Sequence, residues 1–369
     1  MKNKKKNKII FIGSALDFHA IDWYRNIKKI CKTQDVLFAT DLIHSEGHSR
    51  LVNASDEIIE LYNIDWLLFN NQSTLGNIWR NLIKIIFFLI QVQRLKQIVH
   101  NNPNATYHAH TMYYLFLAWK AGIRYIGSPQ GDEILIRPSR SIIYKYFAVK
   151  SLTAADHIIV DSVNLQNGIR KLCNKESAVI QYGIDVTAIK QEINAITEHS
   201  KVVSIRALYP LYRIHEILIA RNNLNSKQHL TLFYPFWEDS YKEKILKMLQ
   251  PIDINMGRIP IKSEMYSVLA SALLVISIPE SDSSPRSVYE SIFSGCCVAT
   301  TYNPWIDSLP DCMRKRVYIV DIEDKQWLKK AIEYAKIVVR EPYCPSEKAL
   351  DMFDQERSMK KVAQEFYNK

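Results

Sequence analysis

The sequence is 369 residues long, with 47% hydrophobic and 23% charged residues, which excludes a disordered chain and provides for two domains of ordinary size. The net charge of +10 is mild for this length, and the six cysteines lack metal or redox spacing, so reduced thiols in a cytosolic protein are expected. No apolar run reaches the roughly eighteen residues of a membrane-spanning helix, and the basic start runs into a short strand without a signal-peptide cleavage site.

Strands and helices are predicted to alternate from the start of the chain. Residues 8–12 form an apolar strand that ends at Gly13, and a helix over 19–31 follows a short loop. This alternation is typical of a parallel α/β sheet, whose ligands lie beyond the carboxyl ends of the strands. Gly13, Asp17 and His19 are therefore expected to face a cleft, with helix capping as the alternative role for Asp17 and His19. Further strands of this half are predicted over 36–39, 56–61, 105–109, 124–127, 157–160 and 179–184.

A basic region occupies residues 76–150, which contain ten Lys or Arg residues and only two acidic residues, so an anionic partner is expected. Its most apolar part, residues 76–100, has an uncharged core too short to cross a bilayer. Basic side chains such as Lys84 and Arg94 surround this core, as in a helix that lies in a membrane interface. The alternative is a core helix whose basic residues are in water.

Two histidines and a glutamine fall at predicted strand ends. His108 and His110 are separated by one residue and therefore point the same way, as two metal ligands would. No third ligand with suitable spacing is visible, so no metal site is predicted. Gln130 precedes Gly131 and Asp132 at the end of another strand.

A second α/β alternation begins near residue 201, after a polar stretch over 186–200. Its strands are predicted over 201–205, 230–234, 252–256, 273–278, 297–301 and 317–320. We therefore predict an N-terminal Rossmann-like domain at 1–190, a C-terminal Rossmann-like domain at 200–345 and a helical tail at 346–369, with a cleft between the domains.

The stretch 276–301 combines a strand, a polar loop, a helix, a glycine and a strand. Asp282 lies in the loop before the helix, and Glu290 lies one to two turns inside it. A helix start beside a polar loop suits a phosphate or polyol ligand. An ordinary βα unit with a capped helix is the alternative.

Several segments resemble, in chain order, the landmarks of retaining GT-B glycosyltransferases, most closely the group often called family four. The first half contributes YHAHTMYYLFLAWKAGIRYIGSPQGDE, AADHIIVDSVNLQNGI and VIQYGID. The second half contributes VVSIRALYPLYRIHEILIA, INMGRIPIKSEMYSVLASALLVISIPES and an acid followed by seven residues and a glutamate. The resemblance covers about residues 8–310 and implies a GT-B fold, in which two Rossmann-like domains with parallel sheets face each other across a cleft.

The resemblance implies donor-binding roles for the stretch around α-helical Glu290. Glu290 matches the acid that accepts hydrogen bonds from the nucleotide ribose, as a carboxylate with two acceptor oxygens can. Asp282 matches the acid that contacts the donor sugar, with Asp where Glu is usual. The backbone N–H groups of Ser283, Ser284 and Arg286 are expected near the sugar and phosphate.

The resemblance also implies which basic side chains bind the diphosphate of the donor. Arg206 matches the arginine that clamps it. The family's lysine falls on Tyr212 or Arg213, and we predict Arg213 because tyrosine carries no positive charge. Gly13 stands for the family's N-terminal glycine pair and is assigned to the donor side. Gln130 replaces the histidine of the family's His-Gly turn, and glutamine can only form hydrogen bonds there.

The implied activity is transfer of a sugar from a nucleotide-sugar donor with retention, in which the departing phosphate serves as base, without a metal or other cofactor. The implied acceptor is a glycan or lipid-linked molecule of lipopolysaccharide or capsule synthesis. An anionic membrane is expected to bind residues 76–100, at the inner face of the membrane in the cytoplasm. Alternatives left open are a catalytically degenerate GT-B scaffold, a nucleotide-sugar epimerase, a phosphorylase and a basic nucleic-acid-binding protein that lacks a recognised module. The acceptor side is assigned to Asp17, His19, His108 and His110.

Overall fold

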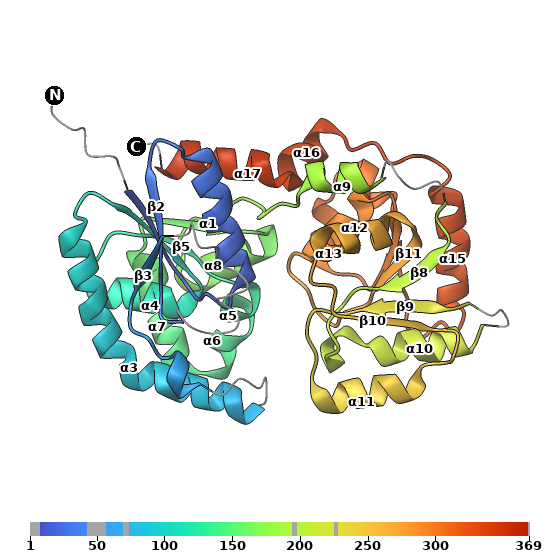
Figure 1. The fold of residues 1–369 in the computed structure, drawn as a ribbon, viewed down its shortest axis with the longest axis horizontal. Helices are drawn as coiled ribbons and strands as arrows, with labels where there is room; N and C mark the ends of the chain where they lie inside the picture. Colours follow the sequence, from blue (N-terminus) through green and yellow to red (C-terminus); the bar gives the residue numbers. More distant parts are fainter. Residues whose placement is uncertain (1–7, 43–56, 69–73, 194–197, 225–227, 368–369) are drawn as a thin grey trace. The chain divides into compact units, whose positions relative to one another are not determined.

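The computed structural model describes residues 8–42, 57–68, 74–193, 198–224 and 228–367. The chain separates into two compact units, residues 1–182 with 356–369, and residues 183–355 (Figure 1). Each unit is an α/β domain around a parallel sheet, which confirms the predicted fold class.

In the described residues, the sheet of the first unit has seven parallel strands in the order β3-β2-β1-β4-β5-β6-β7. Its strands are β1 (Lys8–Ile12), β2 (Asp35–Thr40), β3 (Ile58–Glu60), β4 (Thr106–His110), β5 (Ile126–Ser128), β6 (His157–Val160) and β7 (Ala178–Val179). Its main helices are α1 (Phe18–Ile30), α3 (Thr74–Asn101), α4 (Met112–Ala121), α5 (Gly131–Leu135), α6 (Arg137–Arg140), α7 (Ile142–Ala154) and α8 (Val163–Cys173), with the 3-10 helix η1 (Asp65–Leu67).

The central strand β1 is apolar on both faces because helices cover both sides of the sheet. Ile10 and Ile12 enter the core beneath α3, α4 and α7, whereas Ile9 and Phe11 enter the opposite core with α1. Complete burial of one such side chain contributes about 2 kcal/mol. This two-sided burial explains why the strand is a continuous apolar run in the sequence.

The C-terminal stretch, predicted as a separate helical tail, is divided between the two units. Helix α16 (Glu347–Phe353) packs in the second unit, and Phe353 is buried in its core. Helix α17 (Gln355–Val362) and the π-helical turn η4 (Ala363–Tyr367) return to the first unit. There Met359 and Tyr367 are buried with Trp23 of α1. The last residues therefore complete the core of the first unit.

In the described residues, the second unit has six parallel strands in the order β10-β9-β8-β11-β12-β13. Its strands are β8 (Lys201–Ser204), β9 (Leu230–Phe233), β10 (Ile254–Gly257), β11 (Ala272–Ser277), β12 (Cys297–Thr300) and β13 (Val317–Ile319). Its helices are α9 (Val186–Ile193), η2 (Pro210–Tyr212), α10 (Ile214–Asn222), α11 (Asp239–Met248), α12 (Lys262–Ala270), α13 (Arg286–Phe293), η3 (Pro304–Ser308), α14 (Asp311–Arg314) and α15 (Trp327–Val338).

The predicted strands agree with the observed ones to within a few residues, with two differences. The strand predicted over 179–184 is reduced to β7, because the chain turns at Gly183, where φ is +75° and an added Cβ would lie 2.4 Å from the Gln355 backbone. Residue 56, the start of another predicted strand, lies outside the described residues. Among the described helices, none combines the length and apolar character that crossing a membrane requires.

Candidate functional site

The second unit gathers charged side chains where β8 and β11 end. These two strands are hydrogen-bonded neighbours, so Arg206 and Asp282, which follow them, reach the same edge of the sheet. Arg206 Nη2 lies 2.5 Å from Asp282 Oδ2, and Arg206 Nη1 donates a hydrogen bond of 3.2 Å to Ser287 Oγ. The Asp282 backbone N–H donates to Asn303 Oδ1 at 2.9 Å, which fixes the loop. Two residues predicted from different motifs are thus brought into direct contact.

The loop after Arg206 separates the two candidates for the family's lysine position. The guanidinium carbon of Arg206 lies 4.3 Å from the ring centroid of Tyr212, in cation–π geometry. Arg213 adopts a left-handed backbone conformation with φ of 51°. Its Nε lies 3.6 Å from Glu280 Oε1, and the side chains of this ion pair are partly exposed. Tyr212 therefore packs against Arg206, and Arg213 lies in an ion pair with Glu280.

Glu290 is 5% exposed and lies in the second turn of α13. Tyr266 donates a hydrogen bond of 3.1 Å to Glu290 Oε1, and Arg286 Nε lies 3.6 Å from the same oxygen. Burial, with the nearby Glu290 carboxylate, raises the pKa of Tyr266, which keeps its hydroxyl a donor. Both contacts engage Oε1. The carboxylate is thereby oriented by Arg286 of the same motif and by Tyr266, which the motif does not contain.

The loop before α13 carries the remaining predicted donor ligands. Ser283 and Ser284 are half-buried, and Ser284 Oγ lies 3.4 Å from the Tyr289 hydroxyl. Arg286 is the first residue of α13, whose N-terminal end carries a partial positive charge. Arg206 and Arg286 are each paired with a carboxylate, that of Asp282 and of Glu290, and the start of α13 adds a partial positive charge that suits an anionic group.

In the first unit, Asp17 and Gln130 meet beyond the ends of β1 and β5. Asp17 Oδ1 accepts a hydrogen bond of 3.0 Å from the His19 backbone N–H at the start of α1. Asp17 Oδ2 accepts a hydrogen bond of 2.8 Å from Gln130 Nε2. Burial raises the pKa of Asp17 to about 6, against the lowering effect of the backbone donors. Helix capping, the alternative role of Asp17, is confirmed, and its second oxygen holds Gln130.

Gly13 lets the strands and α1 approach one another closely. A Cβ at Gly13 would lie 3.3 Å from Phe38, 3.4 Å from Ala20 and 3.6 Å from His110 Cβ. The absence of a side chain thus leaves room at the end of β1, where the predicted site residues gather.

The two strand histidines have different surroundings. His108 is fully buried, with Nδ1 bonded to the Tyr367 hydroxyl and Nε2 lying 2.8 Å from Ser128 Oγ. This geometry favours a structural role for His108 over acceptor contact. His110 is 2% exposed, and its Nε2 has no hydrogen-bond partner within the described part of the chain. Burial, with nearby His19, lowers the pKa of His110 to about 3, so its ring is neutral.

Glu133 is a site residue that the sequence analysis missed. Its Oε2 accepts hydrogen bonds from the backbone N–H groups of Gln130 at 3.0 Å and Met112 at 2.9 Å. Gln130 and Glu133 form a capping box on α5, and the three-residue spacing between them was the available signal. Burial raises the pKa of Glu133 to about 7. This side chain ties the turn at Gln130 to the start of α4.

The unfolding free energy of the wild-type protein is expected to fall relative to that of Glu133→Gln as pH rises from 4.5 to about 7. A carboxyl with a pKa of 4.5 unfolded and about 7 folded binds protons more tightly when folded, so its ionisation in this window destabilises the fold. The difference should reach roughly 3 kcal/mol. Denaturant unfolding at several pH values measures it, with exposed Glu323→Gln as control. Parallel pH profiles for wild type and Glu133→Gln would contradict the assignment.

The basic helix α3 is amphipathic, but not all of the basic side chains predicted to contact a membrane are free to do so. Lys84 Nζ lies 3.7 Å from buried Asp41 and 4.4 Å from the ring centroid of Tyr113. Arg94 Nε donates to the Glu60 carbonyl at 3.1 Å. Lys84 therefore anchors α3 to its own domain. The outward face of this helix exposes apolar side chains in its N-terminal half and polar ones in its C-terminal half.

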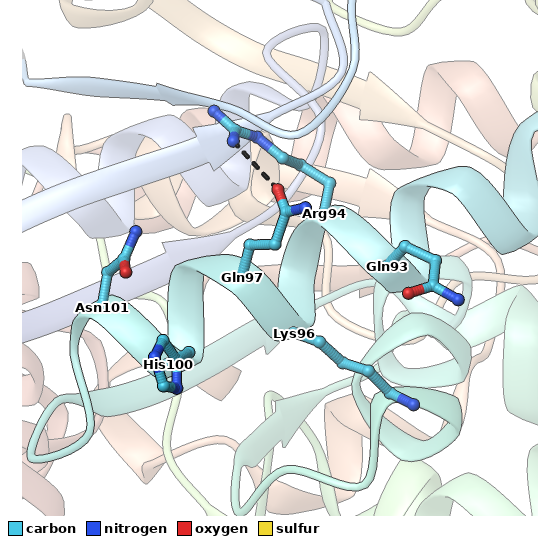
Figure 2. Close-up of a pocket in the computed structure, with 6 residues that line it drawn as sticks. All are labelled: Gln93, Arg94, Lys96, Gln97, His100 and Asn101. Atoms are coloured by element: carbon cyan, nitrogen blue, oxygen red, sulfur yellow. Dashed lines mark hydrogen bonds between the residues drawn. The ribbon is translucent and has the colours of Figure 1, made fainter.

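A depression on the C-terminal half of α3 has a polar lining (Figure 2). Arg94 and Gln97 point toward one another within it, at 3.3 Å between Nη1 and Oε1. It contains none of the predicted site residues, and we assign it no role. The lining residues are Gln93, Arg94, Lys96, Gln97, His100 and Asn101. Within the described ranges, no three His, Cys, Asp or Glu side chains are grouped to hold a metal ion.

The two parallel-sheet units in succession define the GT-B fold class. The sequence matches no protein-family model and no curated protein. The fold is similar to that of Anabaena HepE in complex with UDP and glucose, with a TM-score of 0.73 at 14% identity over 98% of this chain and 100% of that one. It is similar to sucrose-phosphate synthase from Thermosynechococcus elongatus, with a TM-score of 0.73 at 12% identity over 97% and 98%. It is also similar to WaaG, a glycosyltransferase involved in lipopolysaccharide biosynthesis, with a TM-score of 0.65 at 10% identity over 98% and 100%.

Proposed function

We propose that this protein is a glycosyltransferase that moves a sugar from a nucleotide-sugar donor to an acceptor with retention of anomeric configuration. The observation that carries the proposal is the contact of Arg206 with Asp282 and Ser287, one helix turn from the oriented carboxylate of Glu290. The fold neighbour HepE, which was crystallised with UDP and with UDP-glucose, supports a donor of this kind.

In this proposal the second unit binds the donor. Arg206 and Arg286 neutralise the diphosphate, and Arg213 extends the positive charge outward. Glu290 accepts hydrogen bonds from the ribose hydroxyls. Before the donor binds, Asp282 pairs with Arg206. When the donor is bound, the Asp282 carboxylate also accepts hydrogen bonds from hydroxyl groups of the sugar. Because arginines and backbone amides supply the positive charge, no metal ion or other cofactor is required.

The first unit binds the acceptor in the same proposal. The sugar–phosphate bond breaks as the acceptor hydroxyl oxygen forms a bond on the same face of the sugar, and the hydroxyl proton passes to the departing phosphate. Gln130, held by Asp17, contributes a hydrogen bond and no proton. His110, at the end of β4, and His19, at the start of α1, line the acceptor side.

The acceptor that we propose is a lipid-linked molecule or glycan of lipopolysaccharide or capsule synthesis. The neighbours WaaG, involved in lipopolysaccharide biosynthesis, and WaaB, a lipopolysaccharide outer core galactosyltransferase, support this class. We further propose that the protein works in the cytoplasm at the inner face of the membrane, to which the outward apolar turns of α3 attach it.

A thermal-shift panel of UDP-, GDP-, CMP- and dTDP-sugars tests the donor. One donor at a hundredfold excess over its Kd should stabilise the protein by about 2.7 kcal/mol through mass action. Matched free sugars serve as controls and should produce no shift. The absence of stabilisation by every nucleotide sugar would contradict the proposed function.

A further inference from the structure

We propose that the corner between α6 and α7, together with the N-terminal half of α3, docks onto an anionic phospholipid bilayer. This proposal deepens the membrane partner of the proposed function and assigns a second contact outside residues 76–100. We define the docking corner as residues 135–146.

The docking corner exposes large apolar side chains. Ile142 is 88% exposed and Ile143 is 74% exposed, at the first two positions of α7. Ser141 caps this helix by accepting a hydrogen bond of 3.2 Å from the Tyr144 N–H, so the first turn is held in helical form. Tyr144 of the same turn packs against Phe116, and the fully buried residues of α7 begin at Ala148, so Ile142 and Ile143 lie outside the core. Leaving two large apolar side chains in water is unfavourable, which favours a surface that is covered in use.

The charges of the docking corner match an anionic surface. No acidic residue occurs from residue 134 to 155, a span with four basic side chains. Arg137 binds Asp132 at 2.7 Å. Arg140 and Lys145 are exposed and form no ion pair with any other described residue. Isoleucines flanked by unpaired cations suit a membrane interface, where apolar groups insert and cations meet lipid phosphates.

The exposed stripe of α3 belongs to the same helix layer. Ile78, Leu82, Ile85 and Leu89 are exposed and follow one face of the helix at spacings of four, three and four residues. Helices α3 and α7 both pack against α4, through Phe88 with Tyr113 and Tyr144 with Phe116, respectively, and Figure 1 draws all three in the first unit.

The two apolar segments also lie toward the edge of the sheet that carries the acceptor residues. Each helix runs back to the amino end of its next strand, since α3 leads into β4 and α7 leads into β6. Their N-terminal turns therefore lie toward the carboxyl ends of the strands, where Asp17 and Gln130 meet. A bilayer on this surface would present lipid-linked acceptors close to that edge.

Vesicle flotation of the full chain tests the docking corner. Wild type should float with vesicles of three parts phosphatidylcholine and one part phosphatidylglycerol, and less with phosphatidylcholine alone. The Ile142→Gln/Ile143→Gln variant should lose about tenfold in partition. The control Ile261→Gln/Ile337→Gln, which changes two exposed isoleucines of the second unit, should float as wild type does. Neutralising Arg140 and Lys145 should remove the preference for anionic vesicles.

Equal flotation of wild type and Ile142→Gln/Ile143→Gln would overturn the proposal, as would a wild-type dimer that this variant converts to a monomer. Thermal unfolding is measured on the same samples: the Tm without donor reports folding, and the shift of the Tm with donor reports the proposed function. A variant that keeps the shift but no longer floats supports docking. If the wild-type protein shows the donor thermal shift but does not float, the docking proposal is contradicted and the proposed function is not. If it floats but shows no donor thermal shift, the docking proposal stands and the proposed glycosyltransferase function is contradicted.

Discussion

Alanine at position 290 is expected to abolish the thermal stabilisation that the nucleotide-sugar donor confers. The Glu290 carboxylate is buried and oriented by Tyr266 and Arg286 on one oxygen. Loss of charge-assisted hydrogen bonds to a ribose diol should cost about 3 kcal/mol, or about a hundredfold in Kd. Differential scanning fluorimetry with the best donor measures this directly.

Two controls separate ligand binding from folding at this position. Glu290→Gln keeps an oxygen for the Tyr266 hydroxyl and should fold with nearly the wild-type Tm while binding donor weakly. Glu333→Ala changes an exposed glutamate on α15 and should leave the donor shift intact. A full donor shift in Glu290→Ala would remove this residue from the ribose role.

Replacement of Arg206 by alanine should lower kcat about a hundredfold to a thousandfold. Its guanidinium is fixed by Asp282, Ser287 and the ring of Tyr212, so it is preorganised to stabilise charge on the departing diphosphate. Arg206→Lys should recover only part of the rate, since an ammonium cannot reproduce the fork of contacts. Steady-state kinetics would separate kcat from KM.

Arg213 provides an informative comparison, because it lies in the same loop but pairs with Glu280 at 3.6 Å on the outside. Arg213→Ala is expected to reduce kcat less than tenfold, and Arg258→Ala, at an exposed position, should be neutral. A larger loss from Arg213→Ala than from Arg206→Ala would reverse the roles that we assign.

Local patterns predicted the strands and the motif around α13 well, because those signals lie within a few neighbouring residues. The apolar run that ends at Gly13 located β1, and the run over 273–278 located β11. The acid-to-glutamate spacing located Asp282 and Glu290 on the loop and helix where they occur. Hydrophobic burial and helix termination are determined largely by such short segments.

Contacts between distant residues could not be predicted from the same patterns. His108 bonds to Tyr367, which is 259 positions later, so its burial depends on the return of the C-terminal segment to the first unit. Lys84 was predicted as a lipid contact from its neighbours in sequence, whereas its ammonium group is directed to Asp41 on β2's trailing loop. Contacts with residues far away in the sequence thus determine the roles of these two side chains, and the local sequence does not predict such contacts.

The central claim is that this protein transfers the sugar of a nucleotide-sugar donor. The most direct measurement follows release of the free nucleoside diphosphate from the stabilising donor, with a bacterial lipid extract supplied as acceptor and with Arg206→Ala in parallel. We predict acceptor-dependent release by wild type, a glycosylated lipid product with retained anomeric configuration, and about a hundredfold less release by Arg206→Ala. Tight donor binding without release under these conditions, equal in wild type and Arg206→Ala, would contradict the enzyme and favour a degenerate GT-B scaffold.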